Sequence, residues 1–235
     1  MKLEDLDVVY MVKDAIYNEE LRYSLRSVGM NFPHNRLWFV GGKPMYVSPD
    51  KQVIVNQKGK TKWDKVRSML KMVAENGNIT EDFVLFNDDF FIMKPVASLP
   101  PFTYGTLADL CKRVERRNNN RPTRYTMKLK ETARILEEEG LPAMNFELHV
   151  PIILNRKKLL SIIEKYPDVK GTRSLYGNTY LTETSKQMKD VKIFDNHTIP
   201  DADSVFLSTE DVSFARGNAG VCIRQQFPFK SRWEK

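Results

Sequence analysis

The segment Asp82-Phe-Val-Leu-Phe-Asn-Asp-Asp-Phe-Phe-Ile-Met93 constrains the fold of this chain more than any other. Its apolar, aromatic-rich residues end just before Lys94-Pro95, and a run of this length favours a buried central strand over a helix. Within it, Asn87–Asp89 places two adjacent carboxylates at the tip of that strand. Ligands of open α/β sheets bind outside the carboxyl ends of the strands. The segment therefore predicts an α/β sheet with a polar site at this strand end.

Two interpretations of this acidic tip follow from the residues alone. Asp88 and Asp89 offer hard oxygen ligands of the kind that Mg²⁺ or Mn²⁺ uses when it bridges substrate phosphates. Asn and Asp after a strand are also common in turns, because their side chains hydrogen-bond the nearby backbone. The first interpretation predicts a metal-dependent enzyme that acts on a nucleotide diphosphate, and the second predicts only a turn.

The residues on either side of this segment follow the pattern of an α/β domain. The expected elements are strands at Asp7–Val12, Arg36–Val40, Gln52–Val55 and Phe83–Phe86, a helix from Asn18 to Val28 that stops at Gly29, and a helix capped by Thr61 that ends before Gly77. Strands that alternate with helices in this way predict a largely parallel central sheet flanked by helices. No change in composition marks a second domain, so the 235 residues are expected to form one.

The stretch from about residue 105 to 140 is strongly basic and is expected to be a helical insertion. It carries nine Lys and Arg residues between Lys112 and Arg134 against two glutamates. Two helices joined by Asn118–Pro122 are expected. One interpretation is a solvated helical face with a flexible tip. The other is an arm that meets a polyanionic acceptor, and the sequence does not decide between them.

The remainder of the chain predicts a further set of elements. They are a strand at Phe146–Leu154, a helix from Asn155 to about Tyr166, a Gly-flanked loop at Gly171–Asn178, strands near Val191–Phe194 and Ser204–Leu207, and a short helical turn over Thr209–Phe214 capped by Ser208.

Three groups of side chains suit chemistry. Glu147 and His149 lie two residues apart, so on a strand they share one face, and the histidine suits a general base. Arg173, in the Gly-flanked loop, suits bidentate binding of phosphate oxygens. Arg22 and Arg26 lie about one helical turn apart and can project together. Each group also has a structural interpretation: a hydrogen-bonded histidine, a solvated arginine in a surface turn, and helix-surface charge.

The composition restricts the class of partner and the compartment. With 37 Lys and Arg against 30 Asp and Glu, the net charge of +7 favours anionic partners such as nucleotides, polyanionic glycans or nucleic acid. Cys111 and Cys222 are far apart and match no metal spacing, which indicates two reduced thiols. An acidic N-terminus without an apolar core, and no apolar run of spanning length, predict a cytoplasmic protein without a signal peptide or membrane span.

Several blocks, in order along the chain from about Asp7 to Phe214, resemble known families. Asp7-Val-Val-Tyr10, Asn18-Glu-Glu-Leu-Arg-Tyr-Ser-Leu-Arg-Ser27, Phe86-Asn-Asp-Asp-Phe-Phe91 and His149-Val-Pro151 resemble successive regions of the Stealth family. That family includes capsular polysaccharide phosphotransferases and the catalytic part of animal N-acetylglucosamine-1-phosphotransferase. The chain is more similar still to compact bacteriophage proteins labelled glycosyltransferases, which carry blocks like Phe146–Pro151, Leu175–Asn178 and Phe206–Asp211.

The resemblance implies a single nucleotide-sugar transferase domain of the GT-A, Rossmann-like type, with Mn²⁺ or Mg²⁺ as cofactor and a nucleotide-diphosphate sugar as donor. It implies that Asp88 and Asp89 hold the metal and that His149 is the catalytic base, with Asp89 and Glu147 as further catalytic candidates. The positions that would bind the donor are Asn18, Glu20, Arg22, Asn87, Arg173 and Asn178.

Three functions are compatible with these residues. The first is a metal-dependent glycosyltransferase that moves a sugar to an acceptor hydroxyl and releases a nucleoside diphosphate. The second is a sugar-1-phosphate transferase that acts on a glycan and releases a nucleoside monophosphate. The third is a non-catalytic basic module that binds nucleic acid or a phage partner. We favour the first because the compact phage proteins are the more similar family.

The acceptor stays open between modified phage DNA, a cell-wall or capsular glycan, and a virion protein. The basic insertion would supply backbone contacts to DNA, and a base hydroxyl would have to be reached, for example by base flipping. A phage-encoded enzyme would act in the cytoplasm of its bacterial host. The sequence does not indicate an oligomeric state.

Overall fold

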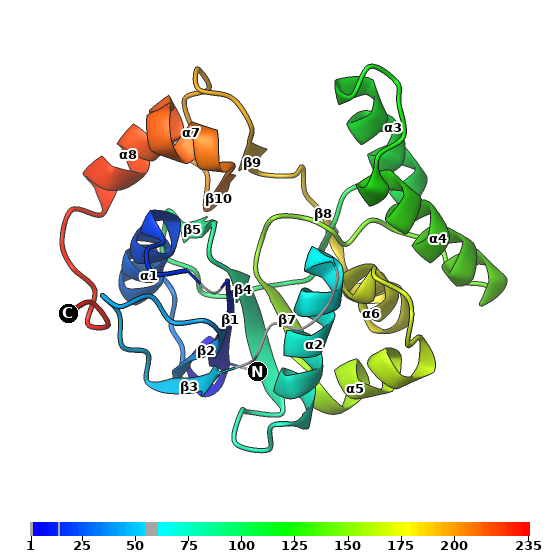
Figure 1. Cartoon of the computed structure of the whole chain (residues 1–235), viewed down its shortest axis with the longest axis horizontal. Helices are drawn as coiled ribbons and strands as arrows, with labels where there is room; N and C mark the ends of the chain where they lie inside the picture. Colours follow the sequence, from blue (N-terminus) through cyan, green and yellow to red (C-terminus); the bar gives the residue numbers. More distant parts are fainter. Residues whose placement is uncertain (1, 14, 55–60) are drawn as a thin grey trace.

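The computed structural model describes residues 2–13, 15–54 and 61–235, and its centre is a five-stranded sheet (Figure 1). The strands are β1 (Asp7–Val12), β2 (Leu37–Gly41), β3 (Lys51–Ile54), β4 (Asp82–Asn87) and β7 (Ile152–Asn155). They lie in the order β3-β2-β1-β4-β7, and only the edge strand β7 is antiparallel to its neighbour. The mixed α/β class and the largely parallel sheet predicted from the sequence are confirmed.

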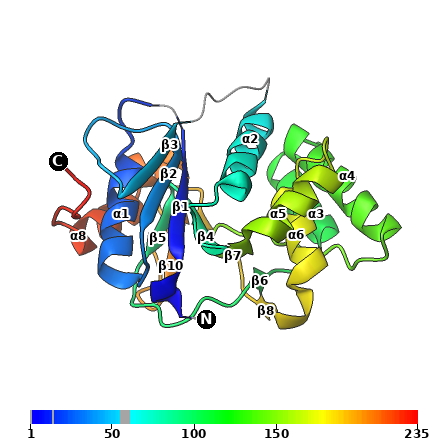
Figure 2. The same cartoon turned by 90° about the horizontal axis from the view of Figure 1, so that it is seen from below.

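Helices cover both faces of this sheet. Successive side chains of a strand point to opposite sides, so each face carries apolar residues that a helix can bury. The flanking helices are α1 (Glu19–Asn31), α2 (Lys62–Glu75), α5 (Arg156–Lys165) and α6 (Thr172–Tyr180). Val8 and Tyr10 of β1 belong to the apolar cluster that includes α1, whereas Val9 belongs to the cluster that includes the other three helices. Figure 2 shows α1 on one side of the sheet and α2, α5 and α6 on the other.

A small second sheet continues from the carboxyl end of β4. It has the order β5-β10-β9, formed by β5 (Phe90–Ile92), β10 (Phe206–Thr209) and β9 (Lys192–Ile193). Asp88 and Asp89 form the turn between β4 and β5, so the turn interpretation of these residues is correct as far as the backbone goes. Two helices, α7 (Asp211–Arg216) and α8 (Asn218–Gln226), follow β10.

The basic insertion is a helical hairpin that extends away from the central sheet (Figure 1). Its helices are α3 (Leu107–Arg117) and α4 (Arg124–Glu138), as the sequence predicts. Each begins with a capping box, made by Thr106 with Asp109 and by Thr123 with Thr126. A further short sheet pairs β6 (Phe102–Thr103), which precedes the hairpin, with β8 (Lys186–Gln187).

The predicted end of the first helix is wrong. Gly29 lies inside α1, which continues to Asn31. A Cβ atom at Gly29 would come within 3.3 Å of the Trp233 ring, so this glycine permits a close approach rather than a helix stop. The helix ends before Pro33, whose ring restricts the residue that precedes it.

Three predictions in the last part of the chain are also wrong. Only the last three residues of the expected strand Phe146–Leu154 lie in a strand, β7, which spans Ile152–Asn155, and Glu147 and His149 lie in the irregular segment before it. Gly171–Asn178 is not a loop, because most of it is α6. Ser208 is in β10, and Glu210 instead caps the following helix.

The remaining elements lie within a few residues of the predicted positions. Of the expected strand Gln52–Val55, Val55 lies outside the described residues. Both cysteines are free thiols, and Cys111 is buried. In the described part of the chain, no helix has the combination of length and apolar character that a membrane span requires.

Candidate active site

Carboxylates gather where the carboxyl end of β4 meets the first turn of α1. Asn18 caps α1 and donates a hydrogen bond from its side-chain amide to Asp88 Oδ2 at 2.6 Å. Glu20, in the first turn of the helix, accepts a hydrogen bond from Thr209 Oγ1 at 2.7 Å. Asn18 therefore connects the acidic turn to α1, and Glu20 connects α1 to β10.

Asp89 is held from the other side by the small second sheet. Its Oδ2 accepts a hydrogen bond from Ser208 Oγ at 3.1 Å and forms an ion pair with Lys192 Nζ at 2.8 Å. Both members of the ion pair are largely buried, since the side chains of Lys192 and Asp89 are 16% and 14% exposed. Asp89 is thus tied to β9 and β10.

The acidity of this carboxylate group is abnormal. Burial raises the pKa of Asp88 to about 6, and the charge of the adjacent Asp89 adds to the effect. Burial also raises the pKa of Glu20 to about 7, with contributions from the charges of Asp89 and Asp88. These negative charges oppose one another, so a bound cation would stabilise all of them.

The donor set fits a divalent cation that binds few protein ligands. Among the described residues, no three His, Cys, Asp or Glu side chains are arranged to surround one ion. Mg²⁺ commonly uses only one or two carboxylates and completes its shell with water and substrate phosphates. Asp88 and Asp89, adjacent and crowded by like charge, suit that mode of binding.

A histidine and an aspartate form a second group. His149 Nδ1 lies 2.9 Å from Asp190 Oδ2, and the His149 backbone N–H donates to Asp190 Oδ1 at 3.1 Å. Because the carboxylate accepts from Nδ1, the other ring nitrogen is the one that can accept a proton. Burial alone would raise the pKa of Asp190, but the hydrogen bond and charge of His149 lower it below its ordinary value. This is the arrangement of an oriented general base.

Glu147 lies in a buried ionic cluster rather than free in solution. Its Oε2 pairs with Lys128 Nζ at 3.4 Å, and its Oε1 accepts hydrogen bonds from the hydroxyl and the backbone N–H of Ser174. Burial alone would raise the pKa of Glu147, yet the charge of Lys128 and the hydrogen bond from Ser174 outweigh it and the pKa is lowered. Both of its oxygens are engaged, and its catalytic role stays a prediction.

Arg173 lies in the first turn of α6 beside this cluster. Its Nη2 donates to the Val150 carbonyl at 2.6 Å, while its Nε is buried and has no hydrogen-bond partner among the described residues. Burial lowers the pKa of Arg173 to about 10, and the charges of Glu147 and Asp190 counteract part of that shift. The phosphate-binding role of Arg173 also stays a prediction. The structure places this residue in a helix and not in the predicted loop.

A cavity of about 620 Å³ is lined by the His149–Asp190 pair and by the cluster of Glu147, Lys128 and Arg173. Its described wall includes Asn87 at the end of β4, His149 and Asp190. Seven cationic side chains line it against three carboxylates. The cations are Lys62, Arg67, Arg117, Lys128, Lys170, Arg173 and Lys192, and the carboxylates are Glu147, Asp190 and Glu210. A cavity of this size and charge suits a phosphorylated ligand.

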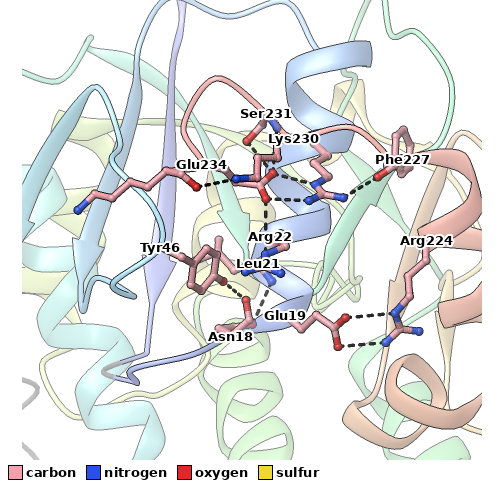
Figure 3. Close-up of polar contacts among 12 residues, drawn as sticks. Asn18, Glu19, Leu21, Arg22, Tyr46, Arg224, Phe227, Lys230, Ser231 and Glu234 are labelled. Carbon is pink, nitrogen blue, oxygen red and sulfur yellow. Dashed lines mark hydrogen bonds and ion pairs between the residues drawn. The ribbon is translucent and has the colours of Figure 1, made fainter.

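Arg22 and Arg26 project together, as predicted, but toward the end of the chain. Arg26 forms a bidentate pair with Glu234, with both distances 2.8 Å, and Arg22 Nε lies 3.5 Å from the same carboxylate. The Arg22 guanidinium also stacks over the Tyr46 ring at 4.5 Å from its centroid. Figure 3 shows Arg22 and Tyr46 beside Asn18, with Glu234 reaching the helix from the C-terminal segment. The donor-binding role of Arg22 stays a prediction.

Asn178 is fully occupied by the protein itself. Its side-chain oxygen accepts from the Met144 backbone N–H, and its amide group donates to the Met144 and Ser174 carbonyls. The residue is buried and fixes the segment that leads to Glu147. Its predicted donor contact stays untested.

The residues that sequence reasoning missed are Asp190, Lys192 and Thr209. Asp190 and Lys192 lie two residues apart in one segment. Asp190 contacts His149, and Lys192 contacts Asp89. Their spacing, two residues apart at the start of a predicted strand, is the only local signal. Thr209 lies in a predicted block, but its partner Glu20 is 189 residues away.

Comparisons with known proteins give distant likenesses to solved structures. No family model matches the sequence, and no curated protein matches it. The galactosyltransferase LgtC, solved with donor and acceptor sugar analogs, has a TM-score of 0.46 and 14% identity over 80% of this chain and 76% of that chain. The apo form of the glycosyltransferase GlyE of Streptococcus pneumoniae TIGR4 has a TM-score of 0.39 and 7% identity over 79% of this chain.

The present chain spans 45% of the length of the GlyE chain. These likenesses compare only the path of the backbone, and both TM-scores are below 0.5. The resemblance to the Stealth and phage families stays a prediction from the sequence.

Proposed function

We propose that this protein is a glycosyltransferase that takes a sugar from a nucleotide-diphosphate sugar in a reaction that depends on a divalent cation. The observation that carries the proposal is the pair His149 and Asp190, an oriented base that opens on the same cationic cavity as the end of β4. The acidic turn at Asp88 and Asp89 follows directly after that strand end. A base, a cation site and a binding space for phosphates are the parts that this reaction needs.

Each group has a defined task in the proposed reaction. Asp88 and Asp89 would hold the ion, which neutralises the leaving diphosphate when bound. Arg173 and Lys128 would bind phosphate oxygens in the cavity. His149 would accept the proton of the acceptor hydroxyl while that oxygen bonds to the sugar carbon. The bond from the sugar carbon to the diphosphate breaks, and the nucleoside diphosphate leaves with the electron pair.

The structural contacts suggest supporting tasks for four other residues. Asn18 holds Asp88 in place, and Glu147 holds Lys128 and the first turn of α6. Asn87 lines the cavity and directly precedes Asp88. Asp190 fixes the orientation and the protonated nitrogen of His149.

Transfer of a sugar phosphate is the second candidate reaction. It is favoured by the position of Arg173 and Lys128, which line the same cavity as the base. In this reaction the acceptor hydroxyl attacks the phosphorus that carries the sugar, and the bond to the nucleoside monophosphate breaks. The two reactions therefore differ in the nucleotide that they release.

The nucleotide product decides between the candidates. Wild-type protein would be incubated with a panel of nucleotide sugars, Mn²⁺, and plain DNA, hydroxymethylated DNA or a glycan mixture. Release of a nucleoside diphosphate, absent from the Asp88→Ala/Asp89→Ala variant, would support glycosyl transfer. Release of a monophosphate would support the second reaction. No release and no donor binding would contradict both and favour a non-catalytic binding module.

For the acceptor we propose a polyanion or glycan, modified DNA included, that contacts the α3–α4 hairpin. Arg116, Arg121 and Arg124 are exposed there, and none of them pairs with a carboxylate in the described part of the chain. Replacing all three by Gln should weaken binding of a polyanionic acceptor and lower the slope of its salt dependence by about one per lost phosphate contact. A matched control replaces Lys2, Lys71 and Lys157 by Gln, since these side chains are 77%, 53% and 77% exposed.

A further inference from the structure

Lys192 is the cation that connects the acidic turn to the cavity. Its ammonium lies 2.8 Å from Asp89 Oδ2, and its side chain also forms part of the cavity wall. Among the described residues that line the cavity, Asp88 and Asp89 do not appear. Lys192 therefore contacts Asp89 from the side on which a phosphorylated ligand would enter.

The partner of Lys192 distinguishes it from the other cations of the cavity. Lys128 pairs with Glu147, which itself lines the cavity, so that cation has a permanent partner within the same wall. Arg173 donates to a backbone carbonyl. Lys192 instead pairs with a carboxylate that the proposed function assigns to a divalent ion.

A divalent ion and the Lys192 ammonium would compete for Asp89. Oxygen Oδ2 of Asp89 already accepts from both Lys192 and Ser208. An arriving Mn²⁺ or Mg²⁺ brings two positive charges close to the ammonium and repels it. A lysine side chain has a flexible four-carbon stem, so it can turn to another anion nearby.

On the basis of the proposed function, we propose that Lys192 couples cation binding to diphosphate binding. Without the ion, Lys192 neutralises Asp89. When the ion replaces the Lys192 ammonium at Asp89, the ammonium turns into the cavity. There it binds the diphosphate of the donor and of the departing product. Ion and diphosphate then favour each other's binding by more than their direct contact alone provides.

The test measures two affinities in the wild type and in the Lys192→Gln variant. Free Mn²⁺ is followed by electron paramagnetic resonance, and the preformed Mn²⁺–pyrophosphate complex is titrated by calorimetry. The variant should bind Mn²⁺ about tenfold more tightly, because no ammonium competes for Asp89. It should bind the Mn²⁺–pyrophosphate complex about tenfold more weakly, because a phosphate ligand is lost.

Two further variants control the result. Lys189→Gln removes an exposed lysine of the same segment and should leave both affinities unchanged. Lys192→Arg keeps the positive charge, so this variant should bind Mn²⁺ with the wild-type affinity. A misfolded variant would not.

Opposite changes of the two affinities support the coupling. Unchanged affinities, a joint decrease of both, or tighter Mn²⁺ binding with unaltered pyrophosphate binding would overturn it. If the wild type binds Mn²⁺ and one of the overturning outcomes is observed, only the role of Lys192 is rejected. If the wild type binds no Mn²⁺, the metal dependence of the proposed function fails as well.

Discussion

Where the acidic turn after β4 meets α1, the pKa values of Asp88 and Glu20 are raised, whereas beside the cavity those of Glu147 and Asp190 are lowered. Burial acts in the same direction on all four carboxyl groups. The difference lies in their neighbours, since Asp88 and Glu20 face other carboxylates, while Glu147 and Asp190 face Lys128 and His149.

This contrast indicates what each part of the site lacks. The carboxylates beside the cavity already have partners, Lys128 for Glu147 and His149 for Asp190, and the cations of the cavity outnumber the carboxylates. The acidic turn has a single ion-pair partner in the described structure, Lys192 on Asp89. One part is therefore suited to receive a cation and the other to receive an anion, as a metal–diphosphate complex would require.

The largest expected effect comes from the acidic turn. Asp88→Asn should lower turnover roughly a thousandfold, because the ion that neutralises the leaving group loses a charged ligand. Removal of divalent ions from the wild type with EDTA should reproduce the loss. The measurement is nucleotide release per enzyme, with Asp203→Asn as control, since that side chain is 93% exposed and pairs with Lys94. Wild-type rates in Asp88→Asn would refute the assignment of a metal site to this turn.

The next effect concerns the base beside the cavity. His149→Ala should lower turnover about a hundredfold, within the usual range for a general base. Asp190→Asn should cost about tenfold and change the pH profile of turnover, because the imidazole loses its orienting carboxylate. Binding of the Mn²⁺–pyrophosphate complex should change little in both variants. A loss of that binding equal to the loss of turnover would mean that His149 binds the donor instead of moving a proton.

Glu147→Gln tests the ionic cluster of the cavity through stability. The variant should lose roughly 2 kcal/mol of unfolding free energy near neutral pH, because Lys128 loses its charged partner. The pKa of Glu147 is lowered in the folded protein, so this stabilisation is present above its unfolded value of 4.5 and is lost as the pH falls through the folded value. Denaturant titrations of both proteins from pH 7 to pH 3 should show the two curves converging. A constant difference would show that Glu147 acts by packing alone.

The smallest expected effect has the opposite sign and concerns Glu20. Its pKa is raised from 4.5 to about 7, so the contribution of this group to stability is full below pH 4.5 and is lost as the pH rises through about 7. Glu20→Gln should therefore stabilise the metal-free protein by roughly 1 kcal/mol at pH 8 and have little effect at pH 4. Thermal melts across this range check it. A variant that is less stable than the wild type at pH 8 would remove the contrast between the two parts of the site.

Local patterns in the sequence predicted most elements of the fold and the chemically important turn. The strand before Asp88, the helix capped by Asn18 and the basic hairpin each depend on neighbours within a few residues, so the periodicity of the chain is sufficient to predict them. Two of the four wrong predictions involve glycines, Gly29 in α1 and the segment Gly171–Asn178. Gly171 precedes α6 and Gly177 lies within it, and both positions require glycine because a Cβ atom there would overlap Thr132 or Phe146. Nothing nearby in the sequence indicates those contacts.

The sequence by itself determined that this chain forms an α/β sheet with carboxylates at the end of a central strand and that His149 is a candidate base. Only the tertiary structure decided which side chains complete the site. Asp190 lies 41 residues from His149, and Lys192 lies 103 residues from Asp89. A hydrogen bond or ion pair between such positions depends on the path of the whole chain, so it leaves no periodicity in the local sequence from which it could be predicted.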